Sequence, residues 1–165
     1  ALGLASAGVG RMERAADAFE AAFRGEAGET SASLARRLEA ARLLGSDPRC
    51  VDWLAPVLRT NPQHTEALWR TGQSEFAGGR RADGLGHLAR AAESDPGDVA
   101  ALAAYAAALL MVGRAEEADA VIEHGRGLDL TAAEAALLEG VVAPPAEEPA
   151  AGASQSEAPG ESRQG

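Results

Sequence analysis

Lysine is absent from this sequence, so all 15 of its basic residues are arginine. This bias favours an origin in a GC-rich bacterial genome, but it leaves open whether the compartment is cytoplasmic or periplasmic. Positive charge is scarce overall, because the formal net charge is -10. Nucleic acids and anionic membrane surfaces bind to basic patches, so we expect neither as the main partner.

Long hydrophobic runs and paired cysteines are missing as well. The longest apolar stretch, residues 99–112, is shorter than the roughly 20 residues that span a bilayer. We therefore predict no membrane insertion. Cys50 is the only cysteine, and it cannot form an intramolecular disulfide.

The residue patterns that identify enzymes are also absent. His64, His87 and His124 are scattered without metal-ligand spacing, and no H-E-x-x-H, C-x-x-C, G-x-S-x-G or Walker pattern occurs. Cys50 occupies a position that favours a small packed side chain, so we interpret it as an inert buried thiol. We therefore predict no catalytic residue, no metal, no cofactor and no enzymatic activity of this chain by itself.

What the sequence does contain is a regular period of roughly 34 residues, a length that is typical of stacked helical repeats. We call this spacing the repeat period. It separates the glycines Gly45, Gly79 and Gly113, and likewise Leu34, Leu68 and Leu102, then Leu54, Leu88 and Ile122, and Pro62 and Pro96. Proteins of this kind act through an extended surface, so the period predicts a binding function.

Capping and helix-breaking residues divide each period into two helices. We predict first helices over residues 31–44, 65–77 and 99–112, and second helices that start at Asp47-Pro48, at Arg81 and at Arg114. Asn61-Pro62 and Asp95-Pro96 end two of the second helices, because proline cannot continue a helix. Thr131 and Glu134 form a capping box that predicts a closing helix over residues 131–142.

Both ends of the chain differ from the full repeats. Gly10-Arg11 matches the Gly-Arg pairs of later copies, so we predict a partial repeat over residues 1–27 with a helix break at Gly10. Because the chain starts inside a repeat, we interpret it as a piece of a longer protein. Residues 144–165 are rich in Pro, Ala, Glu, Ser and Gly, and we predict that they are disordered.

With these features the sequence resembles the tetratricopeptide repeat (TPR) family, whose pattern is W-x2-L-G-x2-Y, then A-x3-F, then P. Four copies follow parts of this pattern in phase, over residues 1–27, 28–62, 63–96 and 97–130. They depart from it where Arg37 and Thr71 replace leucine, Glu75 replaces tyrosine and Leu130 replaces proline. The related Sel1 repeats usually have longer periods. The resemblance implies an all-α, right-handed α-solenoid of antiparallel helix pairs.

In this family the first helices line a concave groove, so the resemblance assigns partner-binding residues by their phase in each copy. These residues are Arg36, Glu39 and Arg42 in the second copy, Trp69, Arg70, Gln73 and Phe76 in the third, and Met111 in the fourth. Some members clamp the C-terminal carboxylate of chaperones. Here only Arg70 fits that set and Glu39 would repel a carboxylate, so we do not expect such a clamp.

Trp69 has two interpretations, unless the register of the pattern is locally in error at this position. It stands one residue after the tryptophan position of the pattern, which rotates it by about 100° around the helix. In one interpretation Trp69, Arg70 and Phe76 form an exposed binding surface, with Arg70 available to a partner carboxylate. In the other, Trp69 and Phe76 pack against the adjacent first helix.

Together these observations predict a protein–protein interaction scaffold that binds a peptide or a partner helix in its groove. Two alternatives remain open. The chain could be the substrate-recruiting module of a larger enzyme whose catalytic domain lies elsewhere, or a structural repeat that self-associates. The sequence does not determine the oligomeric state.

Overall fold

The computed structural model describes residues 2–26 and 28–142, and within these ranges the fold is all-α, as predicted. The helices are α1 (Leu2–Arg24), α2 (Ser31–Leu44), α3 (Cys50–Thr60), α4 (Thr65–Ala77), α5 (Arg81–Ser94), α6 (Val99–Met111), α7 (Ala115–Arg126) and α8 (Ala132–Val142). The tail that we predict to be disordered, residues 144–165, lies outside the described residues.

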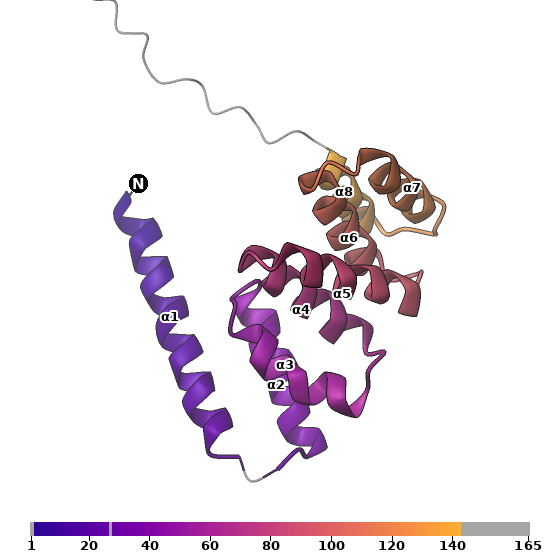
Figure 1. The fold of residues 1–165 in the computed structure, drawn as a ribbon. Coiled ribbons are helices and arrows are strands. Elements are labelled where there is room, and N and C mark those ends of the chain that lie inside the picture. The colour runs from indigo at the N-terminus through magenta and orange to yellow at the C-terminus, as the bar shows by residue number, and fades with distance from the viewer. Residues whose placement is uncertain (1, 27, 143–165) are drawn as a thin grey trace, which may run out of the picture.

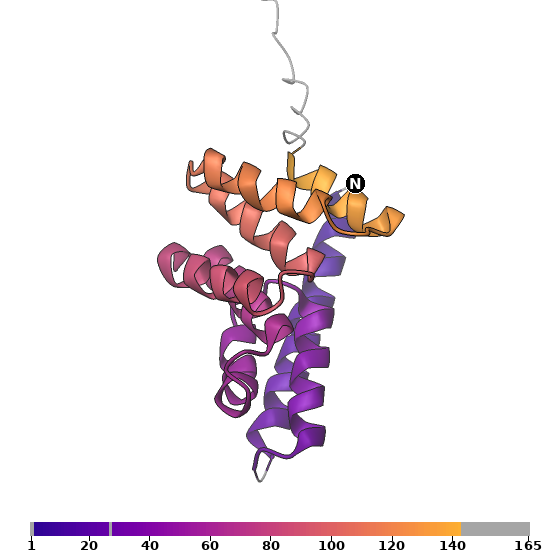
Figure 2. The same cartoon turned by 90° about the vertical axis from the view of Figure 1, so that its right-hand side faces the viewer.

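Helices that follow one another in the chain pack against one another, and α4 also contacts α6, as α6 contacts α8. Figures 1 and 2 show the helices following one another from α1–α3 at one end to α6–α8 at the other. The buried side chains accordingly form a row of clusters. The first contains Phe23, Trp53 and Leu54. Two more join α4 and α5 to α6, and the last two contain Ile122 and Leu138 respectively.

Positions one repeat period apart occupy matching places in this row. Leu54, Leu88 and Ile122 are all buried, with exposed fractions of 0%, 1% and 2%. The three glycines that follow the first helices, Gly45, Gly79 and Gly113, all have a positive φ, which an L side chain rarely adopts. The first helices α2, α4 and α6 also begin one period apart, at Ser31, Thr65 and Val99. The sequence period therefore corresponds to a repeated local structure.

The caps of the first helices follow the same period. The side chains of Thr30, His64 and Asp98 each accept a hydrogen bond from the backbone N–H three residues ahead. At α8, Thr131 and Glu134 form the predicted capping box, in which each side chain accepts from the other residue's backbone N–H.

Asp98 offers a direct test of cap strength, because its Oδ1 accepts from the N–H of Ala101 at 3.0 Å. We expect Asp98→Ala to lower the free energy of unfolding by about 1 kcal/mol, the usual contribution of such a cap. Asp98→Asn keeps an acceptor oxygen and should cost less than half as much. Urea denaturation of the three proteins measures the difference, and equal losses for both variants would contradict the cap's role.

The predicted start of the second helix at Asp47-Pro48 is wrong. Helix α3 begins at Cys50. The carboxylate of Asp47 accepts from the N–H of Arg49, two residues ahead, at 2.9 Å and also binds the Arg49 guanidinium. Because an aspartate that bonds two residues ahead closes a turn, Asp47 caps a turn that precedes the helix.

The predicted break at Gly10 is also wrong, because α1 runs without interruption from Leu2 to Arg24. Gly10 is not among the positive-φ glycines, in contrast to Gly45, Gly79 and Gly113. A glycine inside a helix costs only about 1 kcal/mol relative to alanine. Breaking the helix would lose several backbone hydrogen bonds, and only a packed partner helix could offset that loss.

Candidate functional site

The predicted groove residues Gln73, Phe76 and Met111 line one hollow of about 240 Å³ on the surface formed by α4 and α6. We call this hollow the α4–α6 groove. Its other lining residues are Ser46, Ala77, Leu88, Ala104, Ala107 and Ala108. The residues of α4 and α6 recur at helical spacing, three or four positions apart, so each helix presents one face to the groove.

The floor of the groove is apolar and packed. Phe76 is 8% exposed and clusters with Leu88, Ala104 and Ala108. The alanines of α6 are short, so they leave space above the Phe76 ring rather than filling it. None of the side chains lining the groove is charged, and Ser46 and Gln73 provide its polar groups.

Met111 stands at the rim of the groove and is 65% exposed. Next to it, Leu110 and Val112 are each 36% exposed. Scattered apolar side chains are common on protein surfaces, so the relevant feature is that exposed Met111 borders an apolar hollow. The flexible thioether of methionine adapts to differently shaped partners.

Three of the four charged residues predicted for the groove, Glu39, Arg42 and Arg70, form a separate network with Glu66. Arg42 donates two hydrogen bonds to the carboxylate of Glu66, at 2.7 Å and 2.6 Å, and a third to Glu39 at 3.2 Å. Arg70 donates to Glu66 at 2.9 Å and to the backbone carbonyl of Ala41 at 3.3 Å. Glu66 therefore ties α2 to α4, and it holds two of the three arginines that we expected to face a partner.

These hydrogen bonds change the acidity of Glu66. The hydrogen bonds from Arg42 are the main cause that lowers the pKa of Glu66 to about 2, and the bond from Arg70 adds to it. Burial raises this pKa, but by less than the Arg42 bonds lower it. The same bonds raise the pKa of Arg42. Since the side chain of Arg70 is only 14% exposed, little of its guanidinium is open to an incoming carboxylate.

Trp69 lies on α4 beside this network and faces residues of α6. It is partly buried and packs against the cluster of Phe76, Ala104 and Ala108. The Arg70 guanidinium lies over its ring, 4.3 Å from the centroid. Trp69 does not line the α4–α6 groove, so its contacts in this chain are those of a packed side chain.

Arg36 is not brought to the other predicted residues. Its guanidinium pairs with Glu26, in the segment between α1 and α2, with N···O distances of 2.5 Å and 3.2 Å. Of the eight predicted residues, the structure therefore joins Gln73, Phe76 and Met111 in the groove and Glu39, Arg42 and Arg70 in the network.

Sequence reasoning missed Ser46 and the role of Glu66. Ser46 follows the glycine turn after α2, where phase along a helix no longer predicts direction. Glu66 has the phase of a groove residue, but its bond to Arg42 joins two different helices and depends on how α2 and α4 pack.

Cys50 is fully buried, and its Sγ lies 3.7 Å from the carbonyl of Gly45. Burial raises the pKa of the thiol to about 11. Cys50 therefore stays protonated at neutral pH, and a protonated thiol is a poor nucleophile.

No protein-family model and no curated protein matches this chain. Among the helices in the described part of the chain, none combines the length and apolar character needed to cross a membrane.

Proposed function

We propose that the chain is a TPR-like protein–protein interaction module that binds a peptide or partner helix in the α4–α6 groove. In this proposal the helix pairs α2–α3, α4–α5 and α6–α7 are successive repeats of a right-handed α-solenoid, and α8 closes the array. The burial, caps and glycine turns that match from one repeat period to the next support it.

The observation that carries the binding role is the groove itself. One apolar hollow is surrounded by residues from the same faces of two successive first helices. These are Gln73 and Phe76 on α4 and Met111 on α6. The occupant is a segment that inserts a large apolar side chain above Phe76, because the lining offers no charge to pair with. Arg42 and Arg70 contribute by fixing α4 against α2, since Glu66 already holds them.

Rigid support of the groove favours binding. Apart from Ser46, the lining side chains lie on packed helices rather than on loops, so ordering them on association costs little entropy. Met111 remains exposed at the rim, where it can close over a bound side chain. Aromatic and large aliphatic anchors in such hollows usually provide most of the binding energy of an interface.

The two methionines of the chain provide a matched test. Peptides are selected on the full chain from a random display library, and their affinities are measured by fluorescence polarisation. We expect selected peptides to be enriched in Leu, Phe and Trp, and Met111→Glu to weaken their binding at least tenfold, because a carboxylate would be buried in an apolar hollow.

Met12→Glu is the control, since Met12 is 50% exposed on α1 and far along the chain from the groove. It should bind the selected peptides as the unmodified protein does. Circular dichroism should show equal helicity for both variants. Equal affinity of the Met111→Glu variant, or a selection without apolar consensus, would refute the proposed groove.

A further inference from the structure

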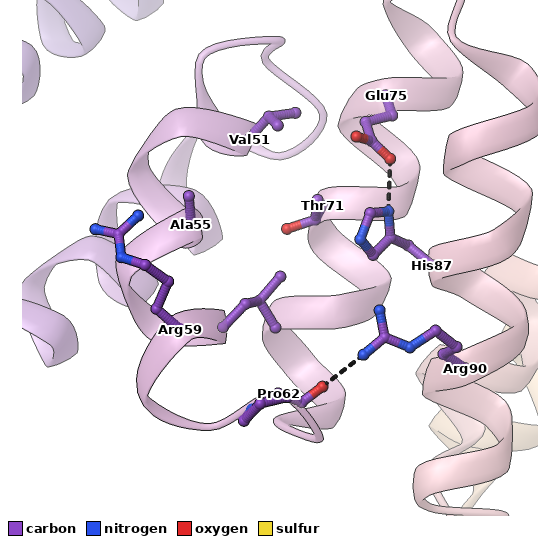
Figure 3. Close-up of a pocket in the computed structure, with 9 residues that line it drawn as sticks. Val51, Ala55, Arg59, Pro62, Thr71, Glu75, His87 and Arg90 are labelled. Atoms are coloured by element: carbon purple, nitrogen blue, oxygen red, sulfur yellow. Dashed lines mark hydrogen bonds and ion pairs between the residues drawn. The ribbon is translucent and has the colours of Figure 1, made fainter.

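A second hollow, of about 390 Å³, lies between α3, α4 and α5. We call it the α3–α5 pocket, and Figure 3 shows its side chains. Val51, Ala55 and Leu58 of α3 form an apolar wall, while α4 and α5 contribute Thr71, His87 and Arg90. The α3–α5 pocket shares no lining residue with the α4–α6 groove.

Thr71 is the most unusual residue of this pocket. It is 3% exposed, and its Oγ1 has no hydrogen-bond partner among the described residues. Figure 3 shows the hydroxyl pointing from α4 into the space in front of α3. A buried hydroxyl without a partner costs about 1–3 kcal/mol. The hydroxyl is therefore placed to bond a group that enters the pocket.

His87 is held in place beside Thr71. Its Nδ1 lies 2.7 Å from Oε2 of Glu75, which is itself only 7% exposed. The other carboxylate oxygen of Glu75 lies 3.7 Å from the Arg80 guanidinium. Both carboxylate oxygens of Glu75 therefore have a partner. The bond to Glu75 orients the imidazole of His87, and the second ring nitrogen faces the pocket (Figure 3).

Arg90 supplies positive charge at the lower edge of the pocket. One of its amino groups donates to the carbonyl of Pro62 at 2.9 Å. A guanidinium has five N–H donors, so others remain for a ligand. Arg59, on the opposite side, is paired with Glu29. The polar groups open to the pocket are therefore the Thr71 hydroxyl, the remaining N–H groups of Arg90 and the second nitrogen of His87, and they face an apolar wall.

The Glu75–His87 pair of the pocket is specific to this copy, whereas polar residues also stand at the Thr71 position of the preceding copy, as Arg37, and at the Arg90 position of the next, as His124. The positions one repeat period after Thr71, Glu75 and His87 hold Tyr105, Leu109 and Val121. Thr71 and Glu75 are also two of the places where the sequence departs from the pattern that it resembles. A purely structural role would be served by the apolar residues of the next copy.

We propose that the α3–α5 pocket binds a small aliphatic carboxylate. The alkyl chain lies on Val51, Ala55 and Leu58, and the carboxylate accepts hydrogen bonds from Thr71 and Arg90. Because Nδ1 of His87 donates to Glu75, the second nitrogen of His87 donates to the ligand only from the doubly protonated ring. A carboxylate satisfies several donors at once, and charge-assisted bonds to arginine are stronger than neutral ones. The volume suits a ligand of this size rather than a folded segment.

Hexanoate is the probe for this site, and hexanamide is its neutral counterpart. Binding to the full chain is followed by NMR through the imidazole signals of His87 and the methyl signal of Thr71. We expect saturable shifts of both signals with hexanoate, with a Kd on the order of 1 mM, as fits so few contact atoms. Hexanamide should bind at least tenfold more weakly.

Two variants locate the site. Thr71→Val keeps the shape of the side chain, removes the unpartnered hydroxyl and should weaken hexanoate binding about fivefold without loss of stability. Arg90→Gln should weaken it at least tenfold. Met111→Glu, in the α4–α6 groove, should bind hexanoate normally, so failure here leaves the peptide-binding proposal untouched. Absence of saturable shifts, equal affinity for hexanamide, or full affinity in Thr71→Val would overturn the inference.

Discussion

Gly84→Val is expected to lower the free energy of unfolding by about 3 kcal/mol, the upper end of the cost of overpacking a well-packed interior. A Cβ atom at Gly84 would lie 2.6 Å from the backbone oxygen of Gly72 and 2.8 Å from the backbone nitrogen of Phe76. These are backbone atoms of α4, so they cannot move aside as a flexible side chain could. Helices α4 and α5 would have to separate.

Gly86→Val is the matched control, because Gly86 lies on the same helix and a Cβ there would meet nothing within 4 Å. Both substitutions change helix propensity equally, and we expect Gly86→Val to change stability by less than about 0.5 kcal/mol. Chemical denaturation followed by circular dichroism compares the two. If both variants were equally stable, α4 and α5 would not be in contact at Gly72 and Gly84.

The close contact also explains a difference between copies. The positions of Gly72 and Gly84 correspond to Ala106 and Ala118 in the next copy, one repeat period later. Ala106 and Ala118 are both fully buried, so α6 and α7 accommodate a methyl group where α4 and α5 do not. Because Phe76 lies in the same part of α4, separating α4 from α5 would also disturb the floor of the α4–α6 groove.

Glu66→Gln is expected to cost about 2 kcal/mol, because it removes the carboxylate that holds both Arg42 and Arg70. The pKa of Glu66 in the folded protein is about 2, below its ordinary value of 4.5. A lowered pKa stabilises the fold above the unfolded-state value, and this contribution is lost as the pH falls from 4.5 towards 2.

The unmodified protein should therefore lose part of its stability over that pH range, and the Glu66→Gln variant should lose less. Thermal unfolding at a series of pH values measures this. Glu39→Gln is the control, since Glu39 is 58% exposed and makes one bond of 3.2 Å to Arg42. It should change stability by no more than about 0.5 kcal/mol. The same pH dependence in Glu66→Gln as in the unmodified protein would contradict the role of Glu66.

Most helices could be predicted from the sequence, because their signals are local. The capping residues Asp98 and Thr131 and the glycine turns act over three or four residues, and the structure confirms each of them. The predicted bounds of α2, α4 and α5 are confirmed as well. Two helix boundaries were predicted wrongly. Gly10 matches the repeat period, but it lies inside a continuous helix. Asp47 closes a turn before α3 instead of capping the helix itself.

The candidate site was predictable only in part. Phase along the first helices brought Gln73, Phe76 and Met111 to the same hollow, as equal spacing on successive first helices should. The position of a residue along its helix could not show that Glu66 bonds Arg42 and Arg70. Nor could it show that Arg36 pairs with Glu26 in the preceding loop. These ion pairs connect different elements, and their partners are chosen by distance across the fold.

The sequence by itself determined that the described chain is helical and that its unit recurs at a fixed period, because caps, breakers and helical periodicity act between near neighbours. Only the tertiary structure decided which polar side chains are free and which are already bonded. That outcome depends on how closely α2, α4 and α5 approach one another. For example, α4 and α5 pack closely only because Gly84 has no Cβ atom. No pattern of neighbouring residues in the sequence predicts such a contact.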